Sequence, residues 1–67
     1  MNGQRLIKLR TWLGFTQQQM ADKLGVYRHT VARWERGERA ISEPMRRLIE
    51  MVVEKETILR ASKLQAS

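Results

Sequence analysis

The chain has no cysteine and very few of the other residues on which catalytic and metal sites depend. Without cysteine it forms neither a disulfide nor a thiolate metal site, and a reducing compartment fits it better than secretion. Its single histidine and its single aspartate, Asp22, leave no catalytic triad and no cluster of metal ligands, and no glycine-rich phosphate loop is present. The sequence therefore predicts a protein that is not an enzyme and that has neither a cofactor nor a bound metal.

Long apolar runs are missing as well. No stretch approaches the roughly 20 apolar residues that a membrane-crossing helix needs, and the start of the chain lacks the charged and then apolar layout of a signal peptide. We therefore expect a cytoplasmic protein without a membrane partner. Its 67 residues form one small domain. Such a domain buries only about 60% of the surface that its unfolded chain exposes, so a partner subunit would add stability.

Acidic residues are scarce in residues 1–47, which contain four of them against ten lysines and arginines, whereas residues 48–67 contain three of each charge. The net charge of +6 thus lies in the first segment. A concentrated basic excess attracts polyanions, so nucleic acid is the favoured partner, ahead of an anionic membrane or an acidic protein.

Strand signals are absent, because the β-branched residues are scattered and no Asn-Gly or Asp-Gly turn occurs. Apolar residues instead recur at helical spacing in residues 4–13, in a segment that starts at the N-cap Thr16, and in residues 28–36. Each of these segments is followed by a glycine, and Gln19 completes a capping box with Thr16. The sequence predicts an all-α protein.

A fourth helical segment is predicted over residues 45–64, with Ser42 or Glu43 as its cap and Pro44 in its first turn. It forms either one long helix or two helices joined near residues 54–56, and we expect residues 65–67 to be frayed. The apolar residues of this segment fall on two sides. One side covers the domain, and the other side, with Met51, Ile58 and Leu59 and with Leu64 nearby, would be exposed in a monomer. We expect this second side to form a dimer interface, and the alternative is that both sides pack within the domain.

The segment 28–36 divides into two faces. At about 100° per residue, Val31 and Trp34 point into the core, and we expect Trp12 to pack likewise rather than to stack on a partner. The opposite arc contains Arg28, His29, Ala32, Arg33 and Arg36. Long cations that share one exposed face repel each other, so a partner that neutralises them is expected.

The spacing of small and apolar residues relates this segment to the one before it. Ala21 lets two helices cross closely, Gly25 permits a tight left-handed turn, and Val31 fills the wedge between the helices. This is the helix-turn-helix pattern, in which the second helix lies in the major groove of DNA.

Here the sequence resembles the Cro/C1-type, phage repressor-like helix-turn-helix family, also called XRE-type. The resemblance covers about residues 5–53 and is strongest in "LRTWLGFTQQQMADKLGVYRHTVARWERGER". It implies a compact bundle of four or five helices of the lambda-repressor-like type, with a DNA-binding domain over residues 1–53 and a helical extension for dimerisation over residues 54–67. One departure is Tyr27, which stands where the family has a serine or threonine cap.

The resemblance also implies a role for particular residues. The base-contacting set is Arg28, His29, Ala32 and Arg33. The phosphate-contacting set is Thr16, Gln17, Tyr27, Arg36 and Arg39. Arg10 and Glu35 match a pair that forms a partly buried salt bridge in some relatives, although a surface pair is the alternative. Since the arginine fork matches guanine O6 and N7, Arg28 and Arg33 predict guanines in each half-site.

The function implied by the resemblance is that of a sequence-specific transcriptional regulator. We expect a homodimeric repressor of its own operon that reads a pseudo-palindromic operator in double-stranded DNA. We expect it to be prokaryotic or phage-encoded, and to be cytoplasmic and associated with the nucleoid when bound. Small members of the family serve as antitoxins, restriction controllers, Cro-like switches or anti-CRISPR-associated regulators. The alternative is an antitoxin-like interaction module whose main role is to neutralise a partner protein.

Overall fold

The computed structural model describes residues 1–66, and the side chains of residues 1–63. Four helices make up this part of the chain, which contains no strand: α1 (Gly3–Trp12), α2 (Gln17–Leu24), α3 (Arg28–Glu35) and α4 (Glu43–Ala66). The all-α prediction is confirmed, and the bundle has four helices rather than five. α4 continues through Gln65 and Ala66, which we expected to be frayed, while Ser67 and the side chain of Leu64 lie outside the described part.

The ends of α2 follow from its sequence. The Thr16 side chain accepts a hydrogen bond from the backbone N–H of Gln19, and the Gln19 side chain accepts one from the N–H of Thr16, which completes the predicted capping box. Gly25 ends the helix in the left-handed conformation, with φ 72°, where a side chain would be strained. α3 follows at once, and Tyr27 precedes it without a capping hydrogen bond from its side chain.

α4 is one continuous helix, so the alternative with a joint near residues 54–56 is excluded. Ser42 supplies the cap, since its hydroxyl oxygen accepts a hydrogen bond from the backbone N–H of Met45 at 3.3 Å. Arg46 bonds to Glu43 and to Glu50 along the first turns. The hydrogen bond from Arg46 lowers the pKa of Glu43, which keeps a negative charge at the positive end of the helix dipole.

Each helix contributes at least one completely buried side chain to the core, and the largest of these are Leu6, Met20, Val31 and Ile49. Trp34 is buried beside them, as predicted. Trp12 differs from the prediction, because 57% of its surface is exposed. It lies in the last turn of α1, where its ring is covered on one face by the guanidinium of Arg60 from α4 and not by the core.

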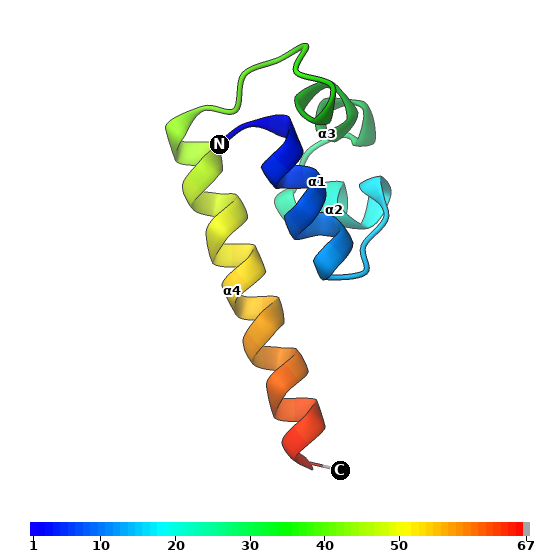
Figure 1. The fold of residues 1–67 in the computed structure, drawn as a ribbon, viewed down its shortest axis with the longest axis vertical. Coiled ribbons are helices and arrows are strands. Elements are labelled where there is room, and N and C mark those ends of the chain that lie inside the picture. The colour runs from blue at the N-terminus through cyan, green and yellow to red at the C-terminus, as the bar shows by residue number, and fades with distance from the viewer. Residues whose placement is uncertain (67) are drawn as a thin grey trace.

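α4 lies along one side of the molecule and extends beyond the other three helices, so the longest dimension is 42 Å (Figure 1). The first residues of the chain lie beside the start of α4, and α3 lies toward that same end of the molecule (Figure 1). Gly3, at the start of α1, sits against the end of α3. A Cβ atom at this position would overlap the carbonyl oxygens of Trp34 and Glu35, so only glycine allows this close approach.

Candidate nucleic-acid interface

α2 and α3 pack against each other in the geometry that the residue spacing predicted. Ala21 is completely buried, as is Val31 across from it, and Gly25 makes the turn between the two helices. Because α3 packs on α1 as well as on α2, its orientation is fixed from two sides. The remaining side of α3 faces solvent.

The exposed side of α3 is strongly basic. Arg28, His29 and Arg33 are all exposed, and Arg36 and Arg39 follow directly after the helix. Arg36 pairs with Glu38. Among the residues whose side chains are described, none forms an ion pair with Arg28 or Arg33. Their guanidinium groups therefore keep all their donors available to a ligand.

The expectation that Ala32 lies on this exposed side is wrong. Only 5% of its surface is accessible, because α3 packs on both α1 and α2 and buries a wider arc than a single partner helix would. The alternation of apolar and charged residues could not reveal this, since alanine fits either face of a helix. The accessible part of the expected base-contacting set is Arg28, His29 and Arg33.

Two aromatic rings stack at the start of α3. The rings of Tyr27 and His29 lie with their centroids 5.4 Å apart and their planes 9° apart. Tyr27 is 75% exposed, so the stack lies on the surface beside the arginines. The sequence reasoning missed this contact, because residues two apart do not meet on a helix and become neighbours here only through the extended backbone of Tyr27.

The start of α2 offers backbone rather than side-chain donors. Gln17 was expected to reach a phosphate, but its side-chain amide donates to Glu35 at 2.9 Å. The hydroxyl oxygen of Thr16 caps the helix. The backbone N–H groups of Gln17 and Gln18 have no acceptor among the described residues and lie at the positive end of the helix dipole.

Arg10 and Glu35 form an ion pair with an N–O distance of 2.6 Å, and their side chains are 16% and 5% exposed. The pair is therefore partly buried, and it is not a surface pair. Arg10 also donates to the carbonyl oxygen of Phe15 at 2.8 Å, and Glu35 accepts from Gln17. This network links the ends of α1 and α3 to the start of α2, and it holds the two helices of the motif in register.

The residues expected at a dimer interface lie on α4. Met51, Ile58 and Leu59 are 65%, 60% and 45% exposed, respectively. They leave an apolar strip on the surface of a small chain, which is unusual unless a partner covers it.

In the described part of the chain, no helix combines the length and the apolar character needed to cross a membrane. Comparison with family models gives one match, to the family described as Helix-turn-helix, over residues 6–50. The match runs from α1 into α4 and includes all of α2 and α3. Neither the comparison with curated proteins nor that with solved structures gave a match.

Proposed function

Because the chain belongs to the Cro/C1-type helix-turn-helix family, whose members are DNA-binding transcriptional regulators, we propose that it is a dimeric repressor of its own operon. In the proposed complex each copy places α3 in the major groove of one half of a pseudo-palindromic operator. Repression follows because the bound dimer occupies the promoter. The proposed site of action is the cytoplasm, on chromosomal or phage DNA.

The observation that carries the proposal is the unpaired basic side of α3. A bidentate pair between an arginine and a guanine discriminates against the wrong base by roughly 1–3 kcal/mol. Arg28 and Arg33 are exposed and unpaired among the described side chains, so they are the side chains proposed to read guanines. His29, with a ring held by Tyr27, is proposed to contact a third base pair.

Phosphate contacts are proposed around this reading surface. The backbone N–H groups of Gln17 and Gln18 would hold one phosphate at the start of α2. Arg36 and Arg39 extend the positive surface along the backbone of the DNA, and the ring of Tyr27 is proposed to pack against the sugar-phosphate backbone beside them. These contacts set the register of α3 and read no sequence themselves.

The test is binding to the DNA directly upstream of the gene, measured at two salt concentrations with wild type, Arg33→Ala and the control Lys63→Ala. Lys63 is an exposed cation near the far end of α4. We expect wild type and control to protect a short inverted repeat and to lose affinity steeply with salt. Arg33→Ala should lose its preference over random duplex. Equal binding of wild type and Arg33→Ala to all DNA would refute the proposal.

A second candidate function is an antitoxin-like module that neutralises a partner protein. The observation that favours it is the hollow formed by Trp12, Thr57, Arg60 and Ala61, which is open and separate from α3. In this case Trp12→Ala should abolish neutralisation of a toxin encoded in the same operon and leave DNA binding unchanged. The repressor function alone predicts no effect of this substitution on growth.

A further inference from the structure

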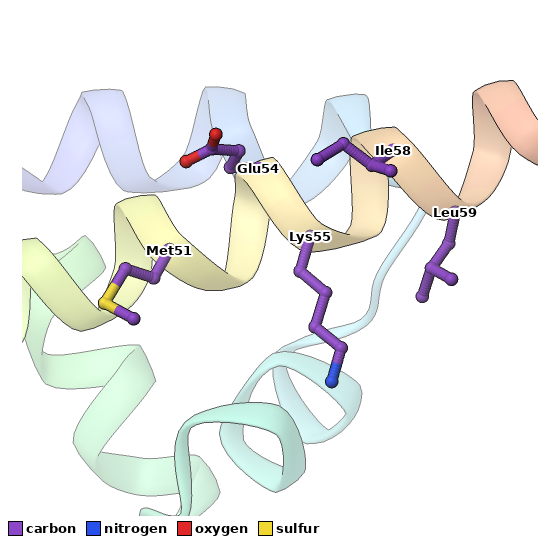
Figure 2. A pocket seen from close by; sticks show the side chains of 5 residues that line it. All are labelled: Met51, Glu54, Lys55, Ile58 and Leu59. Carbon is purple, nitrogen blue, oxygen red and sulfur yellow. The ribbon is translucent and has the colours of Figure 1, made fainter.

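A shallow hollow on the side of α4 is lined by Met51, Glu54, Lys55, Ile58 and Leu59 (Figure 2). The two apolar side chains at its centre, Met51 and Ile58, are among the most exposed large apolar residues of the chain. They are seven residues apart, which is the spacing of one seam in a helix pair. We call this surface the α4 face.

Charge on the α4 face is divided between its two edges. At about 100° per residue, Met51 and Ile58 lie within about 20° of each other, and Glu54 and Lys55 lie about 50° to either side of them. Figure 2 shows Glu54 and Lys55 projecting to opposite sides of α4. One edge of the face is therefore acidic and the other basic, at nearly the same height along the helix.

This division decides how two copies can pair. When two identical helices run in opposite directions around a two-fold axis, each edge faces its own copy, so Glu54 would face Glu54 of the other copy and Lys55 would face Lys55. When they run in the same direction, each edge faces the opposite edge, so Glu54 meets Lys55 twice. Opposite charges attract and like charges repel, so the parallel arrangement is favoured.

We infer that the α4 face is a self-complementary docking surface for a second copy of this chain, with the two α4 helices parallel. Met51 packs on Met51 and Ile58 on Ile58 across the two-fold axis, and two Glu54–Lys55 pairs border them. This inference rests on the dimer in the proposed function and adds its orientation. The seam is short, because Arg47 and Ser62 take the next positions along it, and in the parallel arrangement Arg47 would face Arg47 of the other copy. The dimer is therefore weak without DNA.

The first test is disulfide cross-linking. The chain contains no cysteine, so any disulfide must form through a cysteine that is introduced by substitution. Parallel pairing brings position 58 next to position 58, so Ile58→Cys and Met51→Cys should each form a disulfide dimer on mild oxidation. Antiparallel pairing would separate the two copies of position 51 by about 10 Å along the axis, beyond the reach of a disulfide. Only a mixture of the two variants would then cross-link.

A matched control is Lys8→Cys, an exposed position on α1 outside the α4 face. It reports cross-linking by random collision. Cross-linking of the single variants above this control supports the inference, whereas cross-linking of the mixture alone overturns the parallel orientation. Yields no higher than the control, with or without DNA, overturn the docking surface itself.

The second test concerns charge. Glu54→Lys turns two attractive pairs into two repulsive ones, and sedimentation equilibrium should show dimerisation weakened about tenfold. Adding Lys55→Glu in the same chain exchanges the charges of the two edges and should restore dimerisation. Failure of the double variant to recover would contradict the parallel pairing.

DNA binding by these variants separates the two proposals. If Glu54→Lys still binds a duplex with one half-site in preference to random duplex, sequence recognition by α3 stands, whether or not the variant dimerises. If wild type dimerises but reads no sequence, the α4 face stands and the proposed repressor function fails.

Discussion

Tyr27 stands at the position before α3 where a serine or threonine would cap the helix, and its ring lies instead on the ring of His29. The missing cap costs helix stability of about 1 kcal/mol, while a stacked aromatic pair returns about 0.5–1.5 kcal/mol. Because these two free energies are of similar size, the stack offsets the missing cap, and it favours the stacked orientation of the imidazole. At the scale of a residue, Tyr27 is thus a candidate for positioning His29 toward a base.

A substitution series at Tyr27 tests this positioning. Tyr27→Phe keeps the stack, so binding to a selected half-site should retain its base preference opposite His29. Tyr27→Ala frees the imidazole, and we expect the preference at that one base pair to fall by about threefold to tenfold, the equivalent of the stacking free energy. Competition binding against duplexes that vary this base pair measures the effect.

The control is the same series in a His29→Ala background. If Tyr27 acts through His29, Tyr27→Ala has no further effect on base preference there. A uniform loss of affinity for all duplexes, with unchanged preference, would instead assign Tyr27 to the phosphate backbone alone.

At the scale of the elements, local signals were sufficient for the motif itself. Thr16 with Gln19 and the glycine after each segment predicted α2 and the turn, because capping and left-handed backbone depend only on near neighbours. The burial of Ala32 and the exposure of Trp12 could not be predicted in this way. Each depends on how far a neighbouring helix extends over it, which only tertiary packing decides.

The ion pair between Arg10 and Glu35 joins three helix ends, so its loss should affect the whole motif. Replacing Glu35 by Gln leaves the Arg10 guanidinium, 16% exposed, without a charge partner. We expect the free energy of unfolding to fall by about 2–4 kcal/mol, near the range for breaking a largely buried pair. Urea denaturation followed by circular dichroism measures it.

Glu50→Gln serves as the reference for this measurement, since it removes a carboxylate from the exposed pair with Arg46 and should cost under about 1 kcal/mol. Equal losses in the two variants would show that burial adds nothing to the Arg10–Glu35 pair. Arg10→Met with Glu35→Leu should recover most of the stability, because no unpaired charge remains.

The contact between α1 and the end of α3 depends on Gly3. Gly3→Ala would press a Cβ atom against the backbone carbonyls of Trp34 and Glu35, and backbone cannot rotate out of the way as a side chain can. We expect α1 to shift and the free energy of unfolding to fall by about 1–3 kcal/mol. Thermal unfolding of Gly3→Ala beside Gln4→Ala, at the exposed next position, isolates the steric effect. An unchanged midpoint in Gly3→Ala would mean that α1 does not approach α3 this closely.

At the scale of the whole molecule, the two surfaces lie on different helices, the reading surface on α3 and the α4 face on α4. A two-fold axis along paired α4 helices would present two copies of α3 toward the same end of the dimer, since α3 lies near the start of α4 (Figure 1). We expect such a dimer to read half-sites about one helical turn of DNA apart, roughly 34 Å. Dimerisation through α4 and base recognition by α3 then affect each other only when both copies are bound to the same DNA.

This coupling predicts how Ile58→Asp behaves. Ile58 is 60% exposed, so the substitution should leave the fold and its circular dichroism unchanged while a buried charge prevents pairing of the α4 faces. The variant should bind a duplex with one half-site as wild type does, and it should lose its advantage on a duplex with two. The logarithm of affinity falls with the logarithm of salt concentration in proportion to the phosphates contacted. The slope on the two-site duplex should therefore drop to about half of the wild-type slope. Equal slopes for wild type and variant would mean that one copy makes all the contacts, and the α4 face would then have no part in DNA binding.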